Sequence, residues 1–141
     1  MAARDPIATS PTAILHVDIL CTDVHVQAAF YHEVLGLPFI DPYMPEEDWA
    51  AIDAGGVALF LLGTQNGSRE PRRAPGVDGR PGLDSLALQV GDLDASVAAL
   101  DGSVEWAQDA PTRWEHPSGA TYRFRGLYDP EGNLLYLSEL C

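Results

Sequence analysis

The amino-acid sequence predicts an α+β protein in which one structural unit is written twice. The strand pattern "LHVDILCTDV" at 15–24 recurs as "DSLALQVGDL" at 84–93, so that each position lies 69 residues before its counterpart. Each copy is followed by a stretch with apolar residues at helical spacing. Each half also closes on a glycine-bearing turn and an apolar strand, "GGVALFLL" at 55–62 and "GNLLYLSE" at 132–139. These three observations predict two tandem halves, each a strand, a helix and about three further strands.

Both opening strands end at an aspartate that is well placed to cap a helix. Asp23 precedes "VHVQAAFYHEVLG", where the helical pattern ends at Gly36. Asp92 precedes "LDASVAALDG", which ends in the same way at Gly102. The remaining strands are expected near 37–43, 48–53 and 56–63 in the first half, and near 103–109, 119–128 and 133–140 in the second.

The two halves are expected to form one domain, because 141 residues are typical of a single folded unit. Module one is expected at about 12–63 and module two at about 83–141. The segment 64–82 between them is rich in glycine, proline and arginine, which is typical of a linker or a loop. When the two closing strands are aligned on their turns, Leu59 becomes the counterpart of Tyr136.

The composition argues against several classes of partner. The net charge of −13 gives a surface that repels phosphate backbones and anionic lipid, so neither nucleic acid nor a membrane is expected to bind. No apolar run approaches the roughly 20 residues that cross a bilayer, and the first residues lack the features of a secretory signal. Two cysteines do not make a disulfide framework. A cytoplasmic protein with a neutral or cationic small ligand is therefore expected.

Three stretches resemble signatures of the vicinal oxygen chelate superfamily, which includes glyoxalases, extradiol dioxygenases, fosfomycin-resistance transferases and bleomycin-resistance proteins. "LHVDILCTDVHVQAAFYHEVLGLPF" resembles the family's opening strand and its FY-x-x-x-LG helix end. "GLDSLALQVGDLD" resembles the opening of the second module, and "YDPEGNLLYLSE" resembles the closing DP-x-GN turn and last strand. The resemblance implies two βαβββ modules whose sheets curl into a ligand-binding cup, usually completed in a homodimer.

The resemblance also implies where a metal ion would be held, on the first and last strands of each module. Mapped by motif, these positions are His16 and Ser85 on the first strands and Leu59 and Tyr136 on the last. A first-row divalent ion takes about three ligands from imidazole and carboxylate, and a phenol with a pKa of about 10 is a poor ligand. No metal and no cofactor are therefore expected, although Asp18 on the same strand face as His16 leaves a rebuilt site open.

Strand alternation predicts which side chains line the cup. Those expected to face it are His16, Asp18, Leu20, Val57, Leu59, Leu61, Ser85, Ala87, Gln89, Tyr136 and Ser138. Aromatic residues near strand ends offer faces on which a planar ligand can stack. Trp114 lies in "PTRWEHPSG", which is expected to be a loop, while Trp106 has ordinary core packing as its alternative. The expected ligand-binding residues are His16, Asp18, Trp49, Leu59, Ser85, Gln89, Trp106, Trp114, Tyr122 and Tyr136.

The missing metal ligands, the acidity and the aromatic lining favour a metal-independent binding protein of the bleomycin-resistance type. Such a protein would sequester an aromatic natural product or drug, cationic ones included, and needs no catalytic residue. The alternative is a cofactor-free isomerase, lyase or cyclase in which His16 and Asp18 act as general acid and base. A glyoxalase-like metal enzyme using His16 and further ligands is a third reading. A cup within one chain and a cup across a dimer both remain open.

Overall fold

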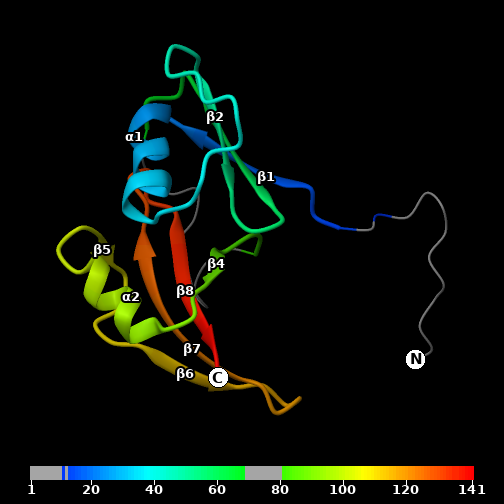
Figure 1. Cartoon of the computed structure of the whole chain (residues 1–141), viewed down its shortest axis with the longest axis vertical. Helices are drawn as coiled ribbons and strands as arrows, with labels where there is room; N and C mark the ends of the chain where they lie inside the picture. The colour runs from blue at the N-terminus through cyan, green and yellow to red at the C-terminus, as the bar shows by residue number, and fades with distance from the viewer. Residues whose placement is uncertain (1–10, 12, 69–80) are drawn as a thin grey trace.

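The computed structural model describes residues 11, 13–68 and 81–141, which form two sheets with helical segments packed beside them (Figure 1). The α+β class is confirmed. In chain order the elements are β1 (His16–Cys21), α1 (Val24–Ala29), the π-helical turn η1 (Phe30–Val34), β2 (Trp49–Asp53), β3 (Ala58–Gly63), β4 (Leu86–Gln89), α2 (Leu93–Leu100), β5 (Glu105–Trp106), β6 (Thr112–Glu115), β7 (Thr121–Tyr128) and β8 (Leu134–Leu140).

Module one contains a three-stranded sheet in the order β1-β3-β2. β1 runs parallel to β3, and β2 runs antiparallel to it. The strand expected near 37–43 is reduced to a single bridge between Phe39 and Ile52. Pro38 and Pro42 flank this bridge and lack the N–H that a longer ladder requires, which explains why the pairing stops after one residue.

Module two contains a five-stranded sheet in the order β4-β8-β7-β5, and β6 also pairs with β7. β5 and β6 lie along the same edge of β7, with Trp106 opposite Leu127 and Thr112 opposite Phe124. The expectation of a loop at "PTRWEHPSG" is therefore wrong for its first part, which is strand. Its threonine and tryptophan favour extended backbone, and the free edge of β7 supplies the partner.

Both helices begin at the aspartates predicted as caps. The Asp23 carboxylate accepts hydrogen bonds from the backbone N–H groups of His25 and Val26, and the Asp92 carboxylate accepts one from Ala95. The first helix continues beyond α1 as the wider turn η1, in which the N–H of Leu35 donates to the carbonyl of Phe30 at 3.0 Å. None of the helices in the described ranges is long and apolar enough to cross a bilayer.

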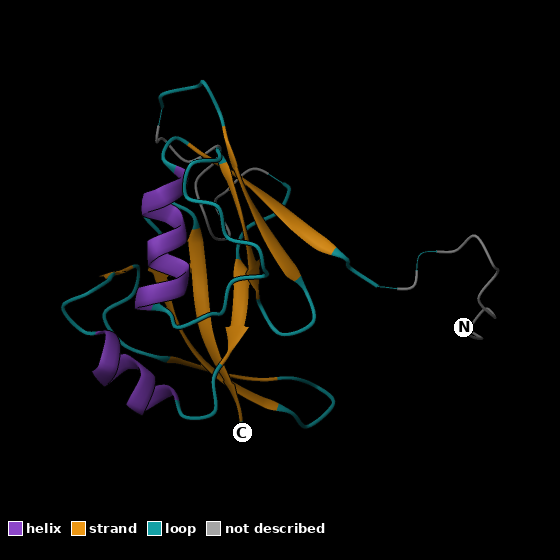
Figure 2. Ribbon diagram, turned by 45° about the horizontal axis from the view of Figure 1, so that its top comes forward, coloured by secondary structure: helices purple, strands orange, loops and turns teal. Residues whose placement is uncertain are grey.

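The hydrophobic core lies on the side of the two sheets that faces the helices, and Figure 2 shows α1 and α2 on the same side of the strands. In β1 the core side chains are Ile19 and Cys21, and in β8 they are Leu135 and Leu137. Because side chains alternate along a strand, the residues between them point to the opposite side, here called the open face of each sheet.

In β3 the two faces are exchanged relative to the prediction. Leu59 is 2% exposed and belongs to the core, so it does not line the open face. The open-face residue is Phe60, which lies opposite Asp18 in the ladder, just as Tyr136 lies opposite Ala87 in module two. Aligning Gly55 with Gly132 makes Leu59 the counterpart of Tyr136, whereas the ladder aligns Gly56 with Gly132. Phe60 is therefore the counterpart of Tyr136.

Candidate functional site

The two modules meet at the turn between β7 and β8, where a buried carboxylate bonds to both. Asp129 is 4% exposed. Its Oδ2 accepts hydrogen bonds from Nε2 of Gln27 at 2.6 Å and from the hydroxyl of Tyr31 at 2.9 Å, both in module one. Asn133 Nδ2 and the backbone N–H groups of Glu131 and Asn133 also donate to this carboxylate. Five donors compensate for the removal of Asp129 from water.

A second carboxylate from the same turn binds the start of the first helix. The Oε1 atom of Glu131 accepts hydrogen bonds from the N–H of Thr22 at 2.6 Å and from the N–H of Asp23 at 3.1 Å. The FY-x-x-x-LG and DP-x-GN stretches therefore contact each other, through Tyr31 and Asp129. The sequence identifies these stretches only as family signatures. In the structure their polar residues form hydrogen bonds that join the two modules.

The open face of the module-one sheet carries a histidine fixed by two neighbours. His16 Nδ1 lies 2.7 Å from Asp18 Oδ1, and the imidazole stacks on the Phe60 ring at 4.5 Å between centroids with an interplanar angle of 17°. A carboxylate only accepts hydrogen bonds, so this contact assigns the donor role to Nδ1 and turns Nε2 away from Asp18. Trp49 and Ala51 share this face, because Ala51 lies opposite Phe60 and Trp49 lies two residues away.

The open face of the module-two sheet carries four aromatic side chains, here called the aromatic row. Tyr136 and Phe124 pack edge to face at 5.3 Å, and Tyr122 and Trp114 stack at 5.7 Å with an angle of 27°. Tyr122 and Phe124 alternate along β7 and so point the same way. Trp114 is 48% exposed, which leaves ring surface open to a ligand.

Tyr136 fits into this row because the residue opposite it on β7 is Gly126. A Cβ atom at Gly126 would lie 3.1 Å from Cε1 of Tyr136, closer than side chains normally approach. Burial raises the pKa of the Tyr136 phenol above its ordinary value, and the charge of Asp84 and then Tyr128 raise it further. The phenol therefore stays protonated at neutral pH and can donate a hydrogen bond.

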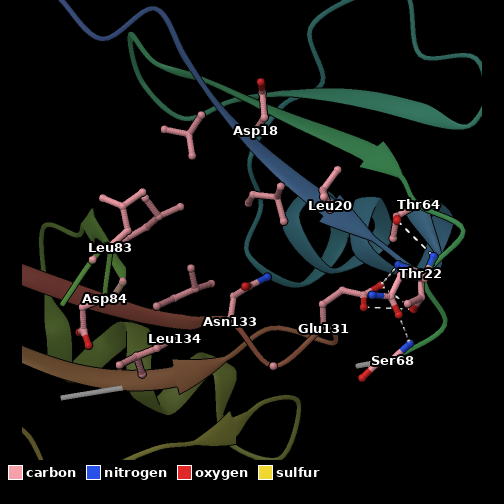
Figure 3. A pocket seen from close by; sticks show the side chains of 18 residues that line it. Asp18, Leu20, Thr22, Thr64, Ser68, Leu83, Asp84, Glu131, Asn133 and Leu134 are labelled. Atoms are coloured by element: carbon pink, nitrogen blue, oxygen red, sulfur yellow. Dashed lines mark hydrogen bonds between the residues drawn. The ribbon is translucent and has the colours of Figure 1, made fainter. Parts of the chain in front are cut away.

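A cleft of about 590 Å³ separates the two sheets along the outer edge of β1 (Figure 3). Asp18 and Leu20 line one side, and Leu83, Ser85 and Leu134 line the other. Four consecutive residues of β1, 17–20, line the cleft, so it is the edge of the strand rather than one face that borders it. Neither His16 nor Tyr136 lines this cleft. Within one chain, the structure does not bring the four motif positions into a single pocket.

The strands beside this cleft, β1 and β4, are the terminal strands of their sheets. The N–H of Ala58 donates to the carbonyl of Leu15, so by alternation the backbone groups of Asp18 point to the outer edge of β1. The N–H of Val90 donates to the carbonyl of Ser138 in β8. By the same alternation, every second residue of β4 points its backbone N–H and carbonyl groups to the outer edge of that strand. No strand in the described part of the chain pairs with either outer edge.

The predicted ligand-binding residues fall into two groups. Those on the open faces or at the cleft are His16, Asp18, Trp49, Ser85, Gln89, Trp114, Tyr122 and Tyr136. The other two, Leu59 and Trp106, pack on the helix side. Trp106 donates from Nε1 to Asp101 and lies under the Arg125 guanidinium at 4.3 Å. It therefore packs against the core, which was the alternative to a ligand-binding role. Sequence reasoning missed Phe124, which the alternation of "TYRF" could have shown.

The corrected motif positions do not fit a divalent metal ion. They hold one imidazole, one hydroxyl, one phenyl ring and one phenol, from His16, Ser85, Phe60 and Tyr136. A phenyl ring has no donor atom, and a protonated phenol or a serine hydroxyl is a weak ligand for ions of this class. Across the residues that the structure describes, no group of three or more His, Cys, Asp or Glu side chains is placed to hold an ion.

Solved structures share this fold over most of their length. Crystal structures of a glyoxalase/bleomycin resistance protein/dioxygenase from Alicyclobacillus acidocaldarius, of TioX from Micromonospora sp. ML1 and of lactoylglutathione lyase from Agrobacterium tumefaciens superpose with TM-scores of 0.61, 0.61 and 0.59. Their identities to this chain are 20%, 19% and 20%. The matches cover 93%, 91% and 92% of this chain and 93%, 98% and 94% of theirs. At such identities the likeness shows the fold alone.

A comparison with curated proteins found no match. The sequence model of one family, in contrast, matches residues 13–137, which span most of both modules and the segment between them. The chain belongs to the Glyoxalase/Bleomycin resistance protein/Dioxygenase superfamily.

Proposed function

We propose that this protein is a metal-independent binding protein that holds a planar aromatic molecule against its open faces. The observation that carries the proposal is the aromatic row, in which Tyr136, Phe124, Tyr122 and Trp114 gather on the side of the sheet away from the core. Stacked and edge-on ring contacts supply affinity through area and quadrupole interactions, and they need no catalytic group. The His16–Phe60 stack supplies a second flat surface, on module one.

The side chains at the motif positions support binding without a metal. Three of the four offer either no donor atom or a weak one, so an ion would have little to hold it. The same residues are suited to an organic ligand, because the Tyr136 phenol remains a hydrogen-bond donor and the His16 ring lies flat against Phe60. A few such polar groups among apolar walls are typical of a small-molecule pocket.

The charge of the chain favours a ligand with a cationic group. The net charge is −13, and Asp18 and Asp84 line the cleft between the sheets. A cation bound near aromatic faces gains both from the ring quadrupoles and from the surrounding negative potential. Aromatic natural products and drugs with amine groups, antibiotics among them, have this chemistry.

A homodimer would complete the cup. On the outer edges of both β1 and β4, every second residue presents its backbone N–H and carbonyl groups outward. A two-fold axis can therefore place β1 of each protomer beside β4 of its partner, which forms two such pairs. Large apolar side chains next to these edges are exposed, with Leu15 at 81%, Leu20 at 47% and Leu83 at 91%. Pairing would cover them and would bring the His16–Phe60 face of one protomer toward the aromatic row of the other.

Titration calorimetry with a panel of planar aromatic amines and their neutral analogues tests the binding. We expect Tyr136→Leu and Phe124→Leu to weaken binding by about tenfold each, because each removes a stacking ring. Trp106→Phe is the matched control and should leave the affinity unchanged, because Trp106 packs on the helix side. Recovery of the unaltered ligand after long incubation supports sequestration. Affinities that are insensitive to Tyr136 and Phe124 would contradict it.

Sedimentation analysis of Ala87→Pro tests the dimer. The N–H of Ala87 points to the outer edge of β4, so proline there removes an inter-protomer donor and leaves the β4–β8 ladder intact. We expect the variant to be a folded monomer with weaker ligand binding. A dimer that survives Ala87→Pro would show that β4 is not the interface.

A further inference from the structure

We propose that His16 and Asp18 form a metal-free catalytic dyad that removes a proton from a planar aromatic carbon acid. The inference goes beyond sequestration, and it rests on the proposed function only because the same open face holds the planar molecule. In this assignment His16 is the catalytic base, and Asp18 and Phe60 are positioning residues. The reaction class is proton abstraction followed by isomerisation or elimination, which requires no oxidant, reductant or metal.

The geometry fixes the imidazole in one orientation. The 2.7 Å contact between His16 Nδ1 and Asp18 Oδ1 turns Nδ1 toward the carboxylate and Nε2 away from it. The stack on Phe60, at 4.5 Å and 17°, holds the plane of the ring parallel to that of its neighbour. A general base needs a defined lone pair within reach of the reacting proton, and these two contacts define the position of Nε2.

The surroundings of the dyad favour its use as a base. Along the adjoining β3 the open-face neighbours are Ala58, Phe60 and Leu62, which carry no charge. On β2 the one acidic side chain of this face is Asp53, whose Oδ1 accepts a hydrogen bond from the N–H of Gly55. Asp18 is therefore the carboxylate that contacts the ring, and it stabilises the imidazolium that forms when Nε2 takes up a proton.

The dyad has little to contribute to the stability of the fold. His16 and Asp18 are two residues apart on the same strand, so their hydrogen bond joins no separate segments. Their side chains are 37% and 48% exposed, and exposed ion pairs of this kind stabilise proteins by about 1 kcal/mol or less. A carboxylate that orients a histidine on the open face is suited to proton transfer, and its structural role is small.

The ring opening of 5-nitrobenzisoxazole is a suitable probe of this chemistry, because the molecule is planar and reacts with a base alone. Nε2 of His16 takes the proton from the ring carbon, and the electrons of that C–H bond complete a nitrile as the N–O bond breaks. The oxygen leaves as a phenolate, which is coloured, and the product is 2-cyano-4-nitrophenolate. The proton then passes from Nε2 to water, which restores the base. Atoms and electrons balance with no further reactant.

The first measurement is the rate of phenolate release by the full-length protein and its variants. We expect His16→Ala to lower kcat/KM by at least about tenfold, and added imidazole to restore part of the rate. His25→Ala, an exposed histidine at the start of α1, is the matched control and should keep the full rate. The rate should be unchanged by EDTA. A rate that His16→Ala leaves intact, or that chelation abolishes, would overturn the proposal.

The second measurement concerns the positioning residue. Asp18→Asn keeps the size of the side chain but removes the negative charge that stabilises the imidazolium, so we expect kcat to fall by about tenfold while KM stays the same. A purely structural role for Asp18 would instead change KM or the melting temperature and leave kcat unchanged. This variant also tests the dyad independently, should His16→Ala fold poorly.

Calorimetry with a non-reacting planar amine, run on the same variants, separates this inference from the proposed function. Intact binding without any His16-dependent rate would overturn the dyad and leave sequestration standing. A His16-dependent rate with no binding of planar amines would overturn sequestration and leave the dyad standing.

Discussion

Asp129 and Asp18 are both hydrogen-bonded aspartates, yet their surroundings differ in every respect. Asp129 is 4% exposed and accepts hydrogen bonds from five donors, two of them in the other module. The Asp18 side chain is 48% exposed, and in the described part of the chain it bonds to a histidine on its own strand. A carboxylate joined to distant segments holds the fold together. A carboxylate with one near neighbour costs the fold little and is available for chemistry.

The largest effect expected from this comparison is that of Asp129→Ala. The change leaves the Tyr31 hydroxyl and the Gln27 amide buried without their acceptor, so we expect a loss of about 3–5 kcal/mol in the free energy of unfolding. Urea denaturation measures it. Asp18→Ala is the matched control and should cost less than about 1 kcal/mol. Equal losses for the two variants would remove the distinction between the aspartates.

A smaller effect is expected when only one donor to Asp129 is removed. Tyr31→Phe keeps the buried ring but deletes a hydrogen bond to a charged group, which is worth about 1.5–3 kcal/mol. Tyr43→Phe serves as the control because the Tyr43 ring stacks on Phe39, a contact that the change preserves. Urea denaturation should rank Tyr31→Phe clearly below the wild type and Tyr43→Phe level with it.

Alkaline pH should destabilise the folded state through Cys21. Burial, followed by the charges of Glu131 and Asp129, raises the pKa of the Cys21 thiol from 9.0 to about 12. The folded state thus keeps a proton that the unfolded state loses, so this stabilisation is complete below about pH 9 and disappears as the pH rises toward 12. The loss is about 1.4 kcal/mol per pH unit in that window. Thermal unfolding of Cys21→Val should show a shallower decline than the wild type, and an identical decline would contradict the assignment.

The smallest effect concerns the aromatic row. Gly126→Ala places a methyl group 3.1 Å from the Tyr136 ring, which must shift by a few tenths of an ångström. We expect about fivefold weaker binding of a planar ligand, equivalent to about 1 kcal/mol. Gly91→Ala is the control, because a Cβ there meets nothing within 4 Å. Calorimetry on both variants measures the difference, and equal affinities would mean that the ring position does not matter.

Local signals in the sequence predicted the local features of this fold. The repeated halves, the caps at Asp23 and Asp92 and the open-face positions of β1 all follow from patterns within a few residues. The register of β3 was missed because Gly55 and Gly56 offer two equivalent places to start the alignment, and strand parity turns a one-residue error into the wrong face. β6 was missed because its polar residues depend on β7 for pairing.

The contacts of Asp129 could not be predicted, because its partners Gln27 and Tyr31 are 102 and 98 residues away in the chain. No periodicity reports on a pair so distant. The assembly of the cup could not be predicted for the same reason, because it also depends on contacts between distant parts of the chain. Most of the residues expected to surround one ligand lie on the open faces, but whether those faces meet within one chain depends on how the modules dock.

The long-range contacts of Asp129 also bear on how the protein is made. Chains are synthesised from the N-terminus, and early segments begin to fold while later ones are still being added. Gln27 and Tyr31 lie in the first helical segment, yet their acceptor is translated 102 and 98 residues later. On the ribosome, the first helical segment therefore cannot form these two hydrogen bonds until the turn at Asp129 has been made, and water must accept from both donors in the meantime.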